Sequence, residues 1–250
     1  MVKTRSMAAK KRNSGLDAVL PTELVVEIVG IVAASSTQPM ADLCSLRSTC
    51  KTMYGVSKER HVGRRLALEK EEGMMWHDNE RYLALLKHLD NADNPEANFI
   101  VGLKHIFAHH NIEQGRECLG RAADGGHKTA AYVLSVVLHT LNDKPDLVKR
   151  YISQVEGDAV EDTKRANKEC QQHRRLAAKA IQDATWKRMG GTGPLGWVPV
   201  LPQDGGGQCT SAGCGMSVGW AGYDIFCSDE CMIRHERVQL FGQVLPNYHP

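Results

Sequence analysis

The sequence predicts a mainly α-helical protein that carries a small cysteine-rich module near its C-terminal end. Apolar residues recur at helical spacing over most of residues 20–156, and the alternation of β-branched and polar residues that marks strands is scarce. Four of the eight cysteines are grouped within residues 209–231. A chain of 250 residues is long enough for one large domain or for two or three small ones.

The composition restricts the class of protein. Hydrophobic residues make up 42% and charged residues 24%, as in an ordinary soluble globular protein. The formal net charge of +2 is too balanced for a dedicated nucleic-acid binder. No run approaches the roughly 18 apolar residues of a membrane span. The sequence therefore predicts no direct nucleic-acid or membrane partner.

The basic start of the chain has no apolar stretch of the secretory kind, so we expect a protein of the nucleus and/or cytoplasm. Lys10, Lys11 and Arg12 are either a solvated tail or part of a nuclear import signal. In a reducing compartment, cysteines remain thiols or bind metals. The cysteine group is therefore expected to be something other than a set of disulfides.

Composition and turn signals divide the chain into segments. Glycine and proline are frequent between the last long helical pattern and the cysteine group, which indicates a linker there. The expected segments are a disordered basic tail (1–15), a three-helix unit (16–60), helical repeats (61–156), a long polar helix (157–190), a Gly/Pro linker (191–208), a zinc knuckle (209–236) and a C-terminal tail (237–250).

The cysteine group has the spacing of a tetrahedral metal site, C-x4-C-x12-C-x3-C. Two close pairs of thiolates separated by a dozen residues suit one structural Zn²⁺. A catalytic zinc would keep an open position, and four cysteines fill the shell, so His235 is expected at the surface rather than as a ligand. The alternative is a set of unrelated free thiols. The predicted zinc ligands are Cys209, Cys214, Cys227 and Cys231.

The same stretch resembles the treble-clef zinc knuckles of the MYND and FCS type, through "CTSAGCG" and "FCSDEC". Gly213 and Gly215 flank Cys214, "SDE" after Cys227 indicates a helix start, and Tyr223 to Phe226 suit a short strand. A full MYND finger has about twice as many ligands as are present here. The resemblance implies recognition of a peptide or a protein.

The stretch from Leu20 to Tyr54 has more apolar groups than a unit of this size can bury alone. Leu24, Val25, Ile28 and Val29 recur at helical spacing after a proline that suits a first helical turn. We therefore expect this face to pack against a partner helix. The alternative is an ordinary helical hairpin that packs on the rest of the chain.

This stretch resembles an F-box, whose pattern begins Leu-Pro-x-Glu-Leu and ends with a helix bearing Asp-Leu-x-x-Leu-Arg-x-x-Cys-Lys. Tyr54 stands where the family usually has a tryptophan, and the "ASSTQPMA" connection is longer than usual. The resemblance implies binding to the Skp-type adaptor of a cullin-RING ubiquitin ligase. The residues it assigns to adaptor binding are Leu20, Pro21, Glu23, Leu24, Ile28, Leu43, Leu46 and Cys50.

The central region is similar to Sel-type, TPR-like helical repeats, through "GLKHIF" and "GRECLGRAADGGHKTAAYVL". "AAYVLSVVL" follows "EANFIVGL" at a period in the mid-thirties, and small residues occur where helices would cross closely. We count one good repeat and a degraded second one. His105 and His109 are expected to be surface or capping residues rather than metal ligands, and Cys118 and Cys170 to be buried or inert.

No nucleophile–base pair, phosphate loop or dinucleotide fingerprint is recognisable, so the sequence predicts a non-catalytic protein. The leading hypothesis is a substrate-recognition subunit of a Skp–cullin–F-box ligase, of the kind found in plants, whose repeats and/or knuckle bind an unknown target protein. The main alternative is a zinc-binding, transcription-associated interaction scaffold without a ligase role. A metal-dependent hydrolase is a third and weaker reading of the cysteine group.

Overall fold

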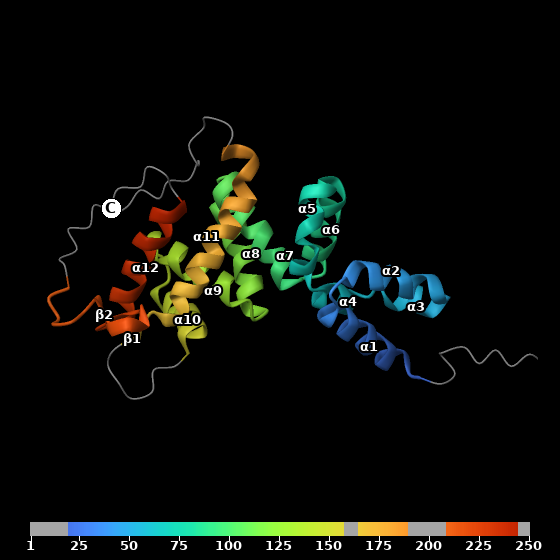
Figure 1. Cartoon of the computed structure of the whole chain (residues 1–250), viewed down its shortest axis with the longest axis horizontal. Coiled ribbons are helices and arrows are strands. Elements are labelled where there is room, and N and C mark those ends of the chain that lie inside the picture. Colours follow the sequence, from blue (N-terminus) through green and yellow to red (C-terminus); the bar gives the residue numbers. More distant parts are fainter. Residues whose placement is uncertain (1–19, 158–164, 190–208, 245–250) are drawn as a thin grey trace, which may run out of the picture. The chain divides into compact units, whose positions relative to one another are not determined.

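The structure is a computed structural model that describes residues 20–157, 165–189 and 209–244 (Figure 1). The chain divides into two compact units, Met1–Asn79 and Glu80–Pro250, and each is described here by itself. The expected basic tail and the expected Gly/Pro linker lie outside the described residues. The prediction of a mainly helical fold is confirmed, since helices make up most of both units.

The first unit is a small helical assembly built around α1. Its elements are α1 (Thr22–Ser35), α2 (Pro39–Thr49), α3 (Lys51–Val56), α4 (Arg60–Arg65), a 3₁₀ turn (Leu68–Glu71) and α5 (Glu72–His77). Helix α1 packs against α2, α3 and α4. Its inward face consists of Val25, Val29 and Ala33, which are buried together with Leu43 of α2 and Val62 of α4.

Polar contacts fix how the helices of this unit sit on one another. Glu27 on α1 accepts from both His61 and Arg65 of α4, and these two contacts lower the pKa of its carboxyl, Arg65 first. Arg47 on α2 donates to the side chain and the backbone carbonyl of the buried Ser57, at 3.0 and 3.2 Å. Within residues 20–79, the outward-facing Leu24, Ile28 and Ile31 of α1 are instead exposed apolar side chains.

The second unit holds the helical repeats. Its helices are α6 (Asn79–Asn91), α7 (Pro95–Leu103) with a π-helical turn (Lys104–Ala108), α8 (Ile112–Asp124), α9 (Lys128–Thr140), α10 (Pro145–Glu156), α11 (Lys168–Met189) and α12 (Asp229–Val244). Helix α7 packs along α8, and α9 along α10, so the expected helical hairpins are present. Asn94, Asn111 and His127 cap α7, α8 and α9 with their side chains.

Glycines allow α7 and α8 to approach closely. A Cβ on Gly102 would lie 2.9 Å from Leu119 Cγ, and a Cβ on Gly115 would lie 2.3 Å from Ile106 Cγ1 and 3.0 Å from the carbonyl oxygen of Gly102. The two backbones therefore meet at a crossing that any larger side chain would force apart.

Replacing Gly115 with alanine is expected to lower the free energy of unfolding by about 1–3 kcal/mol, because its Cβ overpacks this crossing. The matched control is Gly120→Ala in the same helix, where the nearest atom to a Cβ is the Tyr151 hydroxyl at 4.0 Å. That change should be neutral or stabilising by up to about 1 kcal/mol. Urea unfolding of both variants measures the difference, and equal stabilities would contradict the close crossing.

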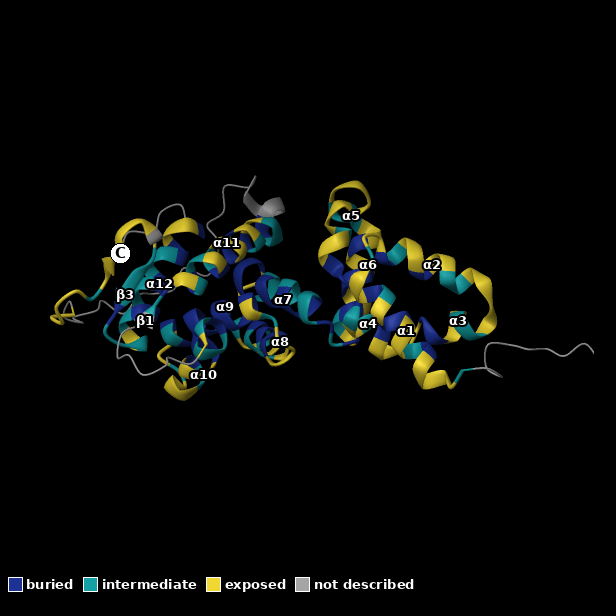
Figure 2. Ribbon diagram, turned by 60° about the horizontal axis from the view of Figure 1, so that its bottom comes forward, coloured by how far each residue is buried: buried dark blue, intermediate teal, exposed yellow. Residues whose placement is uncertain are grey.

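Helix α9 is enclosed by its neighbours. Every residue from Thr129 to Leu138 is buried (Figure 2), and α8, α10, α11 and α12 all pack against it. The main hydrophobic core runs from α7 through α9 and α11 into α12, so that Tyr132, Ile181 and Phe241 belong to one cluster. A helix that is apolar all round has to be buried in this way.

A small three-stranded sheet links the repeats to the cysteine module. Its strands are β1 (Arg165–Ala166), β2 (Met216–Ser217) and β3 (Asp224–Phe226), in the order β1-β3-β2 with antiparallel pairing. A 3₁₀ turn, Gly219–Ala221, connects β2 to β3. The sheet therefore joins residues on both sides of the segment 190–208, which is not described.

Three expected boundaries are corrected here. The long polar helix begins at Lys168 rather than near residue 157, because Arg165 and Ala166 pair with β3 instead. Residues 237–244 are not a tail but the second half of α12, and Leu240, Phe241 and Val244 are buried. The cysteine module is not a separate domain, since α12 packs on α9 and α11 within one unit.

Candidate functional site

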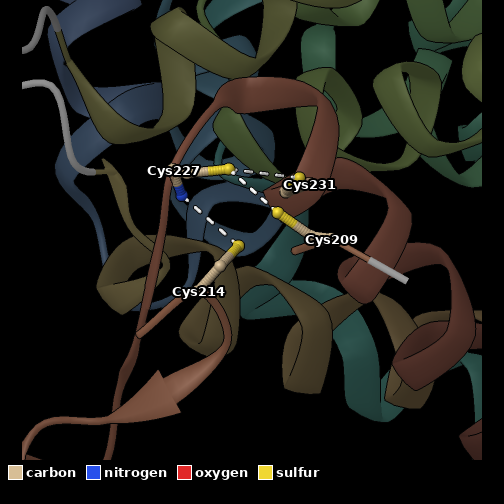
Figure 3. A group of neighbouring side chains, drawn as sticks. All are labelled: Cys209, Cys214, Cys227 and Cys231. Carbon is tan, nitrogen blue, oxygen red and sulfur yellow. Dashed lines mark hydrogen bonds between the residues drawn. The ribbon is translucent and has the colours of Figure 1, made fainter. Parts of the chain in front are cut away.

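The four cysteines that the spacing singled out come together in space (Figure 3). Their sulfur atoms all lie within 4.8 Å of one another, with Cys227 Sγ 3.3 Å from Cys209 Sγ and 3.5 Å from Cys231 Sγ. Zinc–sulfur bonds of about 2.3 Å place tetrahedral sulfurs about 3.8 Å apart. A disulfide needs about 2.0 Å, so the geometry suits a shared metal ion rather than a pair of bridges.

Local backbone geometry presents the sulfurs to one point. Gly213 and Gly215, on either side of Cys214, have φ values of +79° and +77°, which a residue with a Cβ adopts only with strain. The backbone N–H of Cys227 points at Cys214 Sγ at 3.4 Å. Ser228 Oγ accepts from the N–H of Cys231 at 3.2 Å, which fixes the first turn of α12, as the "SDE" start predicted.

The thiols differ in their readiness to ionise. Hydrogen bonds from Ser211 lower the pKa of Cys209 to about 6, whereas burial raises the pKa of Cys214 to about 12. Four thiolates within one small volume repel one another and need a compensating cation. An all-sulfur set at these distances fits Zn²⁺, which would hold all four as thiolates and leave no position for a substrate. The residues present therefore fit a structural metal.

A buried polar cluster attaches this module to the repeats. Glu236 of α12 is 0% exposed and accepts from the Tyr132 hydroxyl of α9 at 2.9 Å, from Asn167 Nδ2 at 2.8 Å, and from Arg174 Nη1 of α11 at 2.9 and 3.0 Å. Asn167 also accepts from the N–H of Asp224 in β3 at 2.8 Å. One carboxylate thus connects α9, α11 and α12.

His235 is not a member of the sulfur cluster. Its ring packs against Phe226 with the centroids 5.1 Å apart, and Nε2 lies 3.5 Å from Asp224 Oδ2. Of the histidines in the repeats, His127 caps α9 and lies 2.7 Å from Glu96, whereas the rings of His105 and His109 contact each other edge to face. Cys118 and Cys170 are buried, as expected.

The second candidate site is the outward face of α1 in the first unit. Leu24 and Ile28 are 52% and 49% exposed, and Ile31, one turn further along the same stripe, is 49% exposed. Pro21 and Glu23 are also exposed at the start of the helix, and Leu20 is half-buried. Large apolar side chains in a continuous stripe are what a partner helix would cover.

The other expected adaptor contacts lie differently. Leu43 is only 1% exposed and belongs to the core of the unit, so it cannot be a contact residue in this arrangement. Leu46 is half-buried on α2. Cys50 is exposed and its sulfur accepts from the N–H of Met53 at 3.5 Å, capping α3 and lowering the pKa of the thiol.

Two exposed features were missed from the sequence. Ile31 continues the spacing of Leu24 and Ile28, so its periodicity was a usable signal. Trp220 is fully exposed in the turn between β2 and β3, close in sequence to the exposed Met216. Nothing in the pattern around Trp220 distinguishes an exposed indole from one packed in the knuckle.

Comparison with known proteins identifies similarities for part of the chain. Residues 69–178 match a family model described as plant tetratrico peptide repeats, which runs from the end of the first unit into α11. The chain is 34% identical over 125 residues to an Arabidopsis thaliana protein named "Putative F-box protein". This alignment covers 50% of the chain and 40% of the relative, so the chain spans less than half of that protein. No solved structure matches.

Within the described residues, no helix is both long and apolar enough to cross a bilayer. The fold is mainly helical, with a region of tetratricopeptide repeats and a small C-terminal region that holds the four-cysteine cluster.

Proposed function

We propose that the chain is the substrate-recognition subunit of a Skp–cullin–F-box ubiquitin ligase. The observation that carries the proposal is the exposed apolar stripe of Leu24, Ile28 and Ile31 on α1, inside the stretch with the F-box pattern. Similarity to a plant protein with an F-box name supports it. The first unit binds the Skp-type adaptor, and the second unit binds a target protein.

This role requires positioning rather than chemistry. The adaptor and cullin supply the ubiquitin-transfer machinery, and the chain raises the effective concentration of the target beside it. Tetratricopeptide repeats present helical surfaces for protein binding, in keeping with a non-catalytic subunit. The same proposal includes three finer assignments. The repeats are of the Sel type, and the cysteine module is a MYND-like knuckle that holds one structural Zn²⁺. The protein is located in the nucleus and/or the cytoplasm.

Adaptor binding tests the proposal directly. The double variant Leu24→Glu/Ile28→Glu is expected to weaken binding of the full chain to a purified plant Skp-type adaptor at least about 100-fold, since central apolar contacts dominate such interfaces. Both side chains are half-exposed, so the far-UV circular dichroism should be unchanged. Biolayer interferometry with immobilised adaptor measures the affinity.

The control is Leu176→Glu, which introduces one carboxylate at an equally exposed leucine on α11. It should leave adaptor binding within about twofold. If the wild-type chain does not bind the adaptor, or if the control weakens binding as much as the double variant, the ligase role is lost.

The second candidate function is a zinc-binding interaction scaffold without a ligase role. The exposed Trp220 and Met216 of the cysteine module favour it, because exposed aromatic and methionine side chains are enriched in protein interfaces. Under this reading the chain binds its partners through the second unit alone. A wild-type chain that binds metal and partner proteins but no adaptor would identify this function.

A further inference from the structure

One side of the repeat hairpins is covered by the chain itself. Helices α11 and α12 pack along α9, and α11 also packs on α7 and its π-helical turn. Ile181 of α11 and Leu240 of α12 are buried in the core that includes Tyr132. A target protein therefore has no access to α9 from the side that α11 and α12 occupy.

A groove remains open where α8, α10 and the end of α9 meet. This α8–α10 groove has a volume of about 550 Å³ and is lined by residues of these three helices and of the α9–α10 connection. Its apolar wall includes Leu138, Leu141, Leu147 and Tyr151, of which Leu141 is 36% exposed. The volume lies within the range of about 300–1,000 Å³ that is usual for ligand pockets.

Acidic side chains edge this groove on α8. Glu113 and Glu117 are one helical turn apart and both are exposed, and the structure records no ion pair for either among the described residues. Arg116 also lines the groove, but its guanidinium is paired with Asp143. Lys144 is the other cation that lines it, so the two carboxylates outweigh the free positive charge. The groove thus combines an apolar wall with an acidic edge.

We propose that the α8–α10 groove binds an amphipathic helix of the target protein, with apolar side chains in the groove and lysine or arginine side chains against Glu113 and Glu117. This proposal rests on the proposed function, since it names the surface on which the target lies. The groove is formed by helices and offers no free strand edge, so side chains rather than backbone pairing must provide the recognition.

A second copy of this chain is a poorer occupant. Its exposed apolar helix, α1, carries Glu23 beside Leu24, and this carboxylate would approach Glu113 and Glu117. Like charges placed together across an interface oppose binding. Charge complementarity therefore favours a basic amphipathic helix.

The test uses the full chain loaded with zinc and a phage-displayed library of helical peptides with randomised faces. The selected peptides are expected to carry apolar residues at i, i+3 or i+4, and i+7, with flanking lysine or arginine. The double variant Glu113→Lys/Glu117→Lys should weaken their binding at least about tenfold, and Leu141→Asp should do the same. Fluorescence anisotropy of labelled peptides measures both effects.

The charge-reversal control is Glu69→Lys/Glu80→Lys, two exposed acids outside the groove, which should leave affinity within about twofold. Selected peptides without basic residues, or with equal affinity for all variants, would overturn the proposal. So would a dimer of the wild-type chain, detected by analytical ultracentrifugation, that Leu141→Asp dissociates. Binding of the Skp-type adaptor by the same groove variants is measured in parallel. If the variants still bind the adaptor, a failure of the groove proposal leaves the proposed ligase role intact.

Discussion

Removing the proposed Zn²⁺ from the four-cysteine cluster is expected to destabilise the whole second unit, residues 80–250, and not only the cysteine-rich segment. The reason lies in α12, which begins between two of the predicted ligands, Cys227 and Cys231, and continues into the core beside α9 and α11. Without the metal, four crowded thiols no longer hold the start of this helix. The loss should therefore extend to helices that contain no ligand.

The expected loss is at least about 3 kcal/mol in the free energy of unfolding. Structural zinc contributes apparent binding energies of about 10–16 kcal/mol in small fingers. An ordinary domain is stable by only about 5–15 kcal/mol in total. Even a fraction of the metal's contribution is then a large part of the stability of the unit.

Hydrogen exchange before and after chelation locates the effect. Amides of α9 and α11 should exchange faster in the metal-free chain, while those of α1 and α4 in the first unit serve as an internal reference. Cys231→Ala should reproduce the change and reduce the metal content from one ion per chain to none. The control Cys118→Ala removes a buried thiol outside the cluster and should cost roughly 1 kcal/mol with the metal retained. Faster exchange confined to residues 209–231 would show instead that the cluster is independent.

The parts of the molecule that the sequence predicts correctly are those specified by local spacing. The cysteine spacing places four sulfurs around one point because each close pair lies on one turn of backbone. The start of α12 follows from Ser228, whose hydroxyl caps the helix that carries Cys231. The apolar stripe of α1 follows from the helical period. Each signal acts over a few residues and does not depend on the rest of the fold.

The parts that sequence reasoning missed depend on contacts distant along the chain. Strand β1 has two residues, too few for any alternation to be recognised, and it exists because Arg165 and Ala166 pair with β3 about sixty residues later. Leu43 has the same apolar character as Leu24, and only the packing of α2 on α1 decides which of the two is buried. Glu236 lies at the end of the expected zinc knuckle, where no local pattern singles it out, whereas three helices meet around it.

Glu236→Gln is expected to lower the free energy of unfolding by about 3–5 kcal/mol, although the two side chains have nearly the same size. The change removes the charge opposite Arg174, whose side chain is 11% exposed, and leaves a guanidinium buried without a carboxylate. It also turns one of the acceptors used by Tyr132 and Asn167 into a donor. Urea unfolding followed by circular dichroism measures the loss.

The same helix provides a matched control. Glu230→Gln also removes a carboxylate that pairs with an arginine, Arg234, and lies 3.0 Å from His139, but its side chain is 61% exposed. Solvent screens such a pair, so the cost should be below about 1 kcal/mol. The comparison isolates the effect of burial, because both variants make the same Glu→Gln change in the same helix, α12. Equal losses for the two variants would contradict a buried, fully bonded carboxylate at position 236.

Replacing both charged partners distinguishes an uncompensated charge from lost packing. The double variant Arg174→Met/Glu236→Leu removes the ion pair but leaves apolar side chains of similar volume in its place. It should be more stable than Glu236→Gln, since no charge is then buried alone. The double variant should recover only part of the wild-type stability, because the Tyr132 hydroxyl and Asn167 Nδ2 lose their acceptor. Each group left unsatisfied costs about 1–3 kcal/mol. A double variant less stable than Glu236→Gln would mean that the carboxylate stabilises the joint between repeats and cysteine module mainly through its neutral hydrogen bonds.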